Sequence, residues 1–345
     1  MKKQRVTIRE VANEVGVSIQ TVSRVLNERP DVAPETRERI LEVIDRLQYR
    51  PSALARSLIK QRSAMLGVVT AGLSYIGPSR TLNGILVQAE TMGYSLLLDE
   101  LPSFETGNAE PILNRMLARQ VDGLIWAVPE VGNNRQHLLD RLPNLPVPIV
   151  FLTMRPHDDL TVVSVDNRMG GHQATTHLLE QGFRQIAHMA GPLSWWEAQQ
   201  RKAGWASVLA DAGLPMDDRF LVQGNWSSSS GERAARQLLR QYPEMDAVFV
   251  ANDQMALGIM HVARQQGLTL PEDLAIVGFD GIPESAYFSP PLTTVHHDLF
   301  EVGATAVKQV VRMIEVAQNS QETETKSILI KPKLIAREST QFRSK

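Results

Sequence analysis

The stretch that decides the fold of the N-terminal part is TIREVANEVGVSIQTVSRVLN, residues 7–27. Thr7 and Glu10 have the T-x-x-E spacing of a capping box, which predicts that a helix begins there. Gly16 ends this helix, because glycine readily takes the left-handed conformation of a helix end. Ser18 then caps a second helix. The apolar residues of both segments recur at helical spacing and predict one buried face on each: Ile8, Val11, Ala12 and Val15, then Val22, Val25 and Leu26.

Two short helices joined by a tight turn indicate a helix-turn-helix, in which the second helix enters the major groove of DNA. The polar residues of this segment are short or fork-shaped donors and acceptors, the types that contact base edges and phosphates. A plain helical bundle with a polar surface is the alternative that the pattern leaves open. The residues that we predict to contact DNA are Thr7, Ser18, Ile19, Gln20, Thr21, Ser23, Arg24 and Asn27.

A third helix is predicted over residues 34–47, because Pro34 fits a first helical turn and apolar residues follow at i, i+3, i+4 and i+7. Ala33 before it offers no side-chain cap. The next segment, residues 52–59, is short, apolar and basic. Without further information, the residues of this segment indicate a linker between two domains.

Composition limits the class of protein. The 345 residues suffice for two or three domains, and the chain has no cysteine, which excludes disulfides and thiolate metal sites and fits a reducing compartment. No apolar run approaches the roughly 18 residues of a membrane span. The first residues lack the apolar core of a secretion signal. Residues 1–62 hold 13 Lys and Arg against 8 Asp and Glu, whereas the net charge of the whole chain is −2. A basic head on an acidic body is typical of a DNA-binding module joined to a sensing domain.

From residue 65 onward, short apolar strands alternate with helices. One series reads MLGVVT, YSLLLD, VDGLIWAV and PIVFL, with helices expected over residues 79–92, 109–119 and 134–142. A second series reads TVVSVD, QIAHMAG, FLVQG, DAVFVAN and LAIVGFD. Such alternation predicts parallel sheets covered by helices, and two series predict two lobes. Ligands of such folds bind outside the carboxyl ends of the strands, so we expect a site between the lobes.

No catalytic signature is present: the chain has no G-x-S-x-G elbow, no Walker phosphate loop and no H-E-x-x-H. We therefore predict no enzyme, no cofactor and no metal. His296 and His297 are adjacent on an extended segment and point to opposite sides, which disfavours joint metal binding. Asp280 follows an apolar strand and faces the expected cleft, so it is a stronger candidate for ligand binding.

The pattern VANEVGVSIQTVSRVLN resembles the DNA-reading segment of the LacI family of bacterial transcription regulators. The segments VDNRMGG, HMAGPLSWWEAQQRKAGW, FVANDQMALG and IVGFDGIPESAYFSPPLTTV resemble further landmarks of that family, so the resemblance covers essentially the whole chain. It implies a helix-turn-helix DNA-binding domain at residues 1–50, a hinge at 51–63 and a two-lobed body at 64–345 that resembles periplasmic sugar-binding proteins. It also implies that the hinge folds on operator DNA, with Leu58 as a minor-groove wedge and Ala55 as its small neighbour.

The same resemblance implies a ligand site. Arg201 precedes the A-G-W segment, Asn252 opens the N-D-Q-M-A-L-G segment, and both are expected to contact the effector, as is Asp280. Trp226 is expected to pack on a sugar face, and Tyr75 to line the cleft. His297 stands where lactose-type repressors use a glutamine. Near the same cleft lie the adjacent Trp195 and Trp196, which would stack a second sugar ring, and we assign Trp196 to the site. The alternative is that Tyr75 and Trp226 are core residues and Arg201 and Asp280 a structural ion pair.

We thus predict a homodimeric, cytoplasmic repressor that binds a palindromic operator, associates with the nucleoid through it, and responds to a sugar or glycoside. A purine-type corepressor is the rival within the family. A solute-binding protein and a sugar-modifying enzyme are the rivals from other classes. Thr153 stands where lactose-type repressors carry a ligand-contacting aspartate, so a lactose-like specificity does not carry over. No leucine heptad follows the last predicted strand, so we expect a dimer rather than a tetramer. Whether the effector induces or co-represses is not in the sequence.

Overall fold

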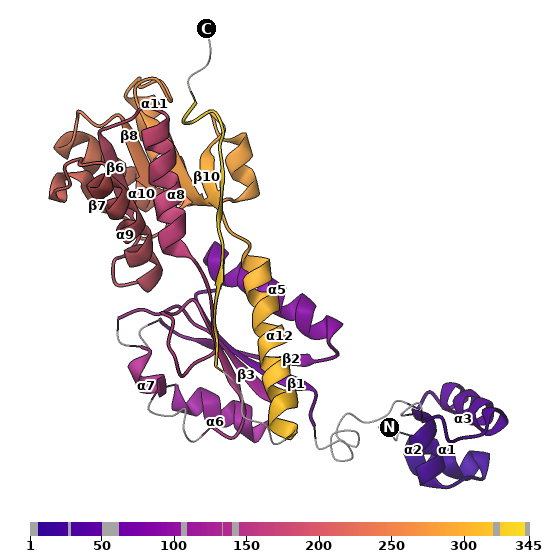
Figure 1. The fold of residues 1–345 in the computed structure, drawn as a ribbon. Coiled ribbons are helices and arrows are strands. Elements are labelled where there is room, and N and C mark those ends of the chain that lie inside the picture. The colour runs from indigo at the N-terminus through magenta and orange to yellow at the C-terminus, as the bar shows by residue number, and fades with distance from the viewer. Residues whose placement is uncertain are drawn as a thin grey trace. The chain divides into compact units, whose positions relative to one another are not determined.

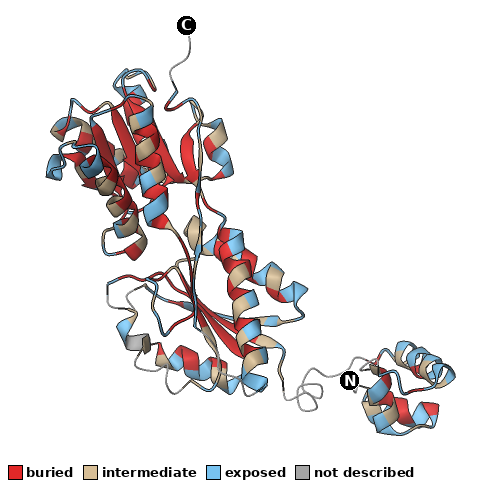
Figure 2. Cartoon of the chain, viewed as in Figure 1, coloured by how far each residue is buried: buried red, intermediate tan, exposed pale blue. Residues whose placement is uncertain are grey.

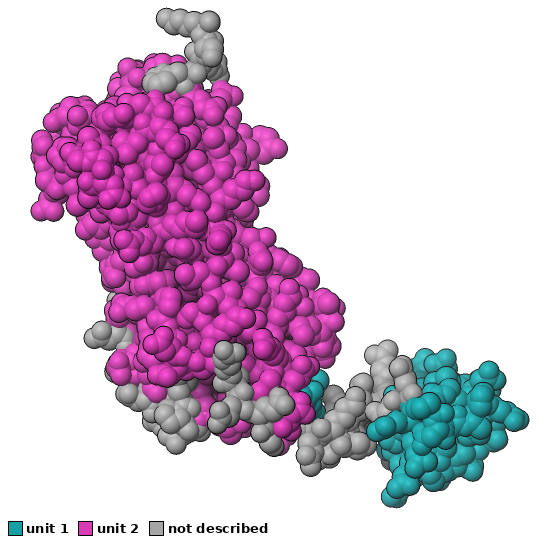
Figure 3. Space-filling model, in the orientation of Figure 1, with its two compact units in different colours: residues 1–64 teal, residues 65–345 magenta. Residues whose placement is uncertain are grey.

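The computed structural model describes residues 6–26, 29–49, 62–104, 109–132, 134–139, 145–319 and 325–341. It divides into two compact units, Met1–Ala64 and Met65–Lys345 (Figure 3). The predicted hinge contacts Ala55 and Leu58, and Asn27 of the head, lie outside the described residues.

The first unit is hereafter called the head. Its described residues form the helices α1 (Ile8–Val15), α2 (Ile19–Leu26) and α3 (Pro34–Arg46) (Figure 1). The predicted capping box is present, because the Thr7 hydroxyl accepts from the Glu10 N–H and the Glu10 carboxylate accepts from the Thr7 N–H at 2.6 Å. Gly16 is left-handed with φ of 76°, and Ser18 Oγ accepts from the Thr21 N–H at 3.1 Å. The buried side chains of the head are Val11, Ala12, Val15, Val22, Val25, Val32, Ile40, Val43 and Tyr49.

The second unit has two lobes, each built on a six-stranded sheet. The sheet of the first lobe has the order β11-β5-β4-β3-β1-β2, and its strand pairs are parallel. Its strands are β1 (Met65–Ala71), β2 (Ser95–Leu101), β3 (Gly123–Ala127), β4 (Ile149–Leu152), β5 (Val162–Val165) and β11 (Ser327–Ile330). The helices of this lobe are α5 (Ile76–Thr91), α6 (Glu110–Ala118), α7 (Gln136–Leu139) and α12 (Leu299–Gln318).

The sheet of the second lobe has the order β12-β10-β9-β8-β6-β7, with β12 antiparallel to β10 at one edge. Its strands are β6 (Ile186–Ala190), β7 (Leu221–Gln223), β8 (Ala247–Val250), β9 (Ala275–Asp280), β10 (Thr293–His296) and β12 (Lys333–Ile335). The helices of this lobe are α8 (Asn167–Glu180), α9 (Trp196–Asp211), α10 (Ser228–Gln241) and α11 (Asp253–Gln265), with 3-10 turns at Asp218–Phe220 and Pro283–Tyr287. In both lobes the central strands are buried and the helices expose their outer faces (Figure 2).

The chain passes between the lobes three times, from β5 to α8, from β10 to α12 and from β11 to β12 (Figure 1). This connectivity departs from the simple order expected from the sequence, because α12 and β11 return late in the chain to complete the first lobe. Two predicted helices also have different bounds. The helix expected over 79–92 begins at Ile76, and the helix expected over 134–142 is the single turn Gln136–Leu139. No helix among the described residues is long and apolar enough to cross a membrane.

Candidate functional site

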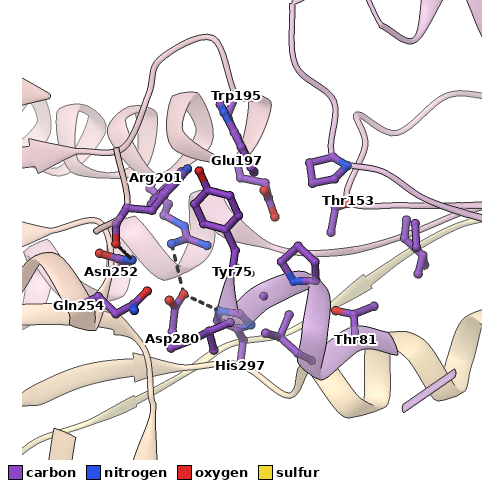
Figure 4. A pocket seen from close by; sticks show the side chains of 18 residues that line it. Tyr75, Thr81, Thr153, Trp195, Glu197, Arg201, Asn252, Gln254, Asp280 and His297 are labelled. Atoms are coloured by element: carbon purple, nitrogen blue, oxygen red, sulfur yellow. Dashed lines mark hydrogen bonds and ion pairs between the residues drawn. The ribbon is translucent and has the colours of Figure 1, made fainter. Parts of the chain in front are cut away.

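A cavity lies between the lobes of the second unit, at the carboxyl ends of strands from both sheets (Figure 4). This is where ligands bind in open α/β sheets. The first lobe contributes Tyr75, Ile76, Gly77, Pro78, Thr81, Ala127, Pro129, Leu152, Thr153 and Leu299. The second lobe contributes Trp195, Glu197, Arg201, Trp226, Asn252, Gln254, Asp280 and His297.

Arg201 is the central cation of this cavity. It projects from α9 and is 5% exposed. Its Nε donates to Asn167 Oδ1 at 2.8 Å, and its Nη1 donates to the backbone oxygen of Ala251 and to Asp280 Oδ1, the latter at 3.4 Å. The guanidinium also lies over the Phe279 ring at 3.7 Å. These contacts fix the plane of the fork and use Nε and Nη1, so Nη2 is the donor left for a ligand.

Asp280 ends β9 and receives two donors on one oxygen. His297 Nε2 lies 3.1 Å from Asp280 Oδ1, the same atom that accepts from Arg201. The carboxylate therefore holds the His297 tautomer with its hydrogen on Nε2. Burial lowers the pKa of His297, which keeps the ring neutral near pH 7. Among the described residues, His297 Nδ1 has no hydrogen-bond partner. Asp280 Oδ2 thus remains as an acceptor beside the donor of Arg201, whereas His297 Nδ1 is itself buried.

Asn252, expected to contact the effector, lines the cavity and also supports its neighbours in the structure. Its Oδ1 caps α11 by accepting from the Met255 N–H, and its Nδ2 donates to the backbone oxygen of Trp226, both at 2.9 Å. The amide is therefore occupied mainly in holding Trp226. The Trp226 ring packs against Gly191, where an added Cβ would lie 2.1 Å from the ring. Among the described residues, the buried Trp226 Nε1 has no acceptor.

Three residues that line the cavity have left-handed backbones although none is glycine. They are Thr153, Trp226 and Asp280, with φ of 53°, 73° and 106°. Such conformations cost about 1–3 kcal/mol each and cluster at ligand sites, where the surrounding structure holds them. Their position at one cavity supports its assignment as a binding site.

An aromatic cluster covers one side of the cavity. Trp195 makes edge contacts with Tyr75, Phe104 and Trp226, with ring centroids 6.2, 4.6 and 5.7 Å apart. Trp196, which the sequence analysis assigned to the site, does not line this cavity. Trp195 is the extended cap residue of α9 and Trp196 its first helical residue, so their side chains diverge. The Trp196 ring lines a separate recess together with residues such as Arg155 and Arg168.

The two lobes also meet through their backbones. Val131 of the first lobe and Trp195 of the second form an antiparallel bridge. The Trp196 N–H donates to the Glu130 oxygen and the Gly132 N–H donates to the Ser194 oxygen, both at 3.1 Å. We call residues 130–132 and 194–196 the interlobe bridge. It joins the aromatic side of the cavity to both lobes.

Glu197 is the functional candidate that sequence reasoning missed. It lies in the first turn of α9 and lines the cavity. Burial raises its pKa to about 7, with nearby Arg201 opposing and Asp280 reinforcing the rise. The i, i+4 spacing from Glu197 to Arg201 was the signal that could have placed it on the same helix face. Gln254 and Thr81 also line the cavity and were not predicted.

The predicted DNA-contacting side chains of the head lie on its surface where the structure describes them. Thr7, Ser18, Gln20 and Arg24 are exposed, and Ile19 is 42% exposed although it is apolar. The half-buried members of the set are Thr21 and Ser23. Arg24 is paired only loosely, with Asp31 at 3.5 Å. A polar helix face with one exposed apolar residue suits contacts to base edges and thymine methyl groups.

No group of three or more His, Cys, Asp or Glu side chains is arranged to hold a metal ion among the described residues. A helix-turn-helix head followed by a two-lobed body with a polar and aromatic cavity defines a ligand-responsive DNA-binding regulator. Residues 7–52 match the family model described as bacterial regulatory proteins, lacI family, and residues 175–340 match a periplasmic binding protein-like domain.

The whole chain resembles characterised regulators. It is 33% identical to catabolite control protein A of Priestia megaterium, covering 97% of this chain and 99% of that protein. It is 32% identical to the ribose operon repressor of Halalkalibacterium halodurans, covering 97% of each. The structure of the lac repressor dimer bound to operator and the anti-inducer ONPF matches with a TM-score of 0.86 at 31% identity, covering 98% of this chain and 99% of that one. A CelR–cellobiose complex matches with a TM-score of 0.71 at 29% identity, covering 97% and 100%. The chain belongs to the LacI family of bacterial transcription regulators and is a DNA-binding regulator rather than an enzyme.

Proposed function

We propose that this protein is a homodimeric transcriptional repressor whose affinity for a palindromic operator is controlled by a sugar or glycoside bound between its two lobes. The observation that carries the proposal is the arrangement of Arg201, Asp280 and His297 at the carboxyl ends of the strands, beside the rings of Trp195 and Trp226.

This arrangement has the chemistry that a sugar requires. A guanidinium donor and a carboxylate acceptor side by side match vicinal hydroxyl groups, each of which both donates and accepts. Indole rings offer apolar faces to the C–H side of a pyranose. Among similar structures, the lac repressor was solved with ONPG and CelR with cellobiose, both of them glycosides.

The head supplies the DNA-binding half of the proposal. The residues proposed to contact the operator are Thr7, Ser18, Ile19, Gln20, Thr21, Ser23, Arg24 and Asn27, with Ala55 and Leu58 in the hinge. Two heads in a dimer would contact two half-sites about one DNA turn apart, so the operator should be palindromic. Since its target is bacterial DNA, we place the protein in the cytoplasm, at the nucleoid when it is bound to DNA.

An exposed apolar surface on the first lobe supports the dimer. Strand β2 is an edge of its sheet, and Leu98 on it is 44% exposed. On α5 and at its C-cap, Leu86, Val87 and Met92 are between 37% and 52% exposed. An unpaired edge strand beside exposed apolar side chains is a surface that a symmetric partner covers. Effector binding that changes how the first lobes pair would then alter the spacing of the heads, which is coupling between two sites.

A purine-type corepressor is the second candidate, because PurR of Erwinia tasmaniensis is 33% identical over 96% of each chain. A planar base needs two parallel aromatic faces. Trp195 instead meets the rings of Tyr75 and Trp226 edge-on, which favours a sugar.

The experiment is a titration of the full-length protein with glucose, galactose, ribose, lactose, cellobiose, hypoxanthine and guanine, following its tryptophan fluorescence. Saturable quenching by a sugar supports the proposal. A response to the purines alone would make the protein a purine-dependent regulator and would contradict it.

A further inference from the structure

One carboxyl group that lines the cavity, that of Glu197, has no hydrogen-bond partner within the part of the chain that the structure describes. Among the described residues, Glu197 forms no hydrogen bond and no ion pair. Arg201 lies one helical turn away on the same face of α9, but its Nε and Nη1 are engaged by Asn167, Ala251 and Asp280. Glu197 is half-buried and lines the cavity, so its carboxylate can accept hydrogen bonds from the donors of a bound ligand.

Among the described residues that line the cavity, Arg201 is the one positively charged side chain that could donate to Glu197. From the second lobe it is faced by Arg201, by Asp280 at the end of β9 and by the neutral His297. From the first lobe, the single ionisable side chain among the described lining residues is Tyr75. The first-lobe wall is otherwise apolar apart from the hydroxyls of Thr81 and Thr153. The cavity thus holds two carboxyl groups and one guanidinium.

The two carboxyl groups lie on different sides of the cavity. In Figure 4, Glu197 lies beside Trp195 on the side towards Thr153, whereas Asp280 and His297 lie together on the opposite side. A ligand held at one side by Arg201 and Asp280 therefore meets a second acceptor at its other side. Neutral hydroxyl groups suit this acceptor, because Glu197 with a pKa near 7 is only partly ionised before ligand binds.

We propose that Glu197 is a specificity-determining residue of the effector site, and that its carboxylate accepts hydrogen bonds from sugar hydroxyl groups on the side of the ligand away from Asp280. The inference rests on the proposed sugar response. Glu197 would add a polar contact on the side of the sugar away from Asp280. The site would then distinguish sugars by the hydroxyl groups on both sides of the molecule.

A consequence is that effector binding is linked to pH. Hydroxyl donors favour the ionised carboxylate, so the pKa of Glu197 falls when the effector binds. Binding then releases a proton near pH 7, where free Glu197 is half protonated. The affinity for the effector should reach its maximum above pH 8. It should fall as the pH drops below 7, by at most about tenfold per pH unit, because one proton is released on binding. Asp253 also has a pKa raised to about 7, but it does not line the cavity and its oxygens accept from Thr294 and Ile282. Any contribution of Asp253 to the pH dependence of effector binding is therefore the same in the wild type and in the Glu197 variants.

The test uses the full chain and whichever of glucose, galactose, ribose, lactose and cellobiose binds with the highest affinity. Isothermal titration calorimetry at pH 6, 7 and 8, in buffers of different ionisation enthalpy, gives both the affinity and the number of protons released. Glu197→Gln should bind about 10- to 100-fold more weakly at pH 8, because hydrogen bonds to a charged group are lost. It should also release no proton near pH 7. Asp211→Asn, a matched carboxyl-to-amide change at an exposed position of the same helix, should behave like the wild type.

Several outcomes separate the inference from the proposed function. If a sugar binds the wild type and Glu197→Gln keeps its affinity, the inference fails while the sugar response stands. Weaker binding with an unchanged pH profile would mean a structural role and would also overturn it. If Glu197→Gln does not fold, Glu197→Asp serves as the second variant. It keeps the carboxyl group and should still release a proton when the sugar binds. If none of the five sugars binds the wild type, the proposed function fails and the inference falls with it.

Discussion

Asn252 donates a hydrogen bond from Nδ2 to the backbone oxygen of Trp226 at 2.9 Å, while its Oδ1 caps α11. One amide therefore fixes both a helix start and the left-handed backbone that presents an indole ring to the cavity. The position of the Trp226 ring in the cavity therefore depends on the Asn252 side chain.

This relationship gives the first prediction. Asn252→Asp keeps an oxygen to cap α11 but loses the donor to Trp226, whereas Asn252→Ala loses both. We expect Asn252→Ala to lower the free energy of unfolding by about 1 kcal/mol or more, the usual loss for an N-cap. Both variants should bind effector more weakly. Urea unfolding and fluorescence titration measure the two effects, and wild-type effector affinity in Asn252→Asp would show that the Trp226 contact is unimportant.

Arg201 should separate sensing from DNA binding. Arg201→Ala removes the central donor and leaves Asp280 with His297 alone, so effector affinity should fall by at least about 100-fold. Operator affinity without effector should stay within about threefold of the wild type. Fluorescence anisotropy with labelled operator DNA checks both statements. An Arg201→Ala protein that still responds to effector would exclude Arg201 from the ligand site.

Arg24 should show the opposite separation. It is exposed on α2 and pairs with the exposed Asp31 at 3.5 Å, so its loss should cost little stability. Arg24→Ala should weaken operator binding by about 10- to 100-fold, the range for a specific arginine contact to a base. Arg46→Ala is the matched control, since Arg46 is an exposed head arginine paired with Glu14 at 2.7 Å. Equal losses in the two variants would indicate general electrostatics rather than a specific contact.

The interlobe bridge should contribute to effector affinity by holding Trp195 in place. Asn134 holds the first-lobe segment of the bridge, since its Oδ1 accepts from the Val131 N–H at 3.2 Å and its Nδ2 donates to the oxygens of Phe104 and Pro129 at 3.0 and 2.8 Å. Asn134→Ala should loosen the contact of Val131 with Trp195 and weaken effector binding by about fivefold, the equivalent of one net hydrogen bond. Stopped-flow fluorescence should show faster effector dissociation. An unchanged dissociation rate would mean that the bridge does not restrain the bound ligand.

Much of the architecture follows from local sequence. The capping box of Thr7 and Glu10, the left-handed Gly16 and the Ser18 cap are each formed by residues close together in the sequence, so the head helices could be predicted closely. The strand–helix alternation likewise predicted two lobes and a ligand site at the strand ends. Arg201, Trp226, Asp280, His297 and Tyr75 do line one cavity, as expected.

The remainder depends on contacts between distant segments. Whether Trp195 or Trp196 faces the cavity is decided by where α9 begins, and helix starts are the least certain feature of a sequence pattern. The bridge between Val131 and Trp195 joins residues of different lobes and has no local signal. Glu197 was missed because a single glutamate in a first helical turn normally reads as a favourable surface charge.

Sugar control of DNA binding can be measured by fluorescence anisotropy, with the operator affinity of the full-length dimer followed during titration with the sugar that quenches its tryptophans. We expect this sugar to change the operator dissociation constant by at least about tenfold, equivalent to about 1.4 kcal/mol of coupling free energy, and we expect Arg201→Ala to abolish the change. If a sugar saturates the cavity while operator affinity stays constant, the protein is not a sugar-controlled repressor.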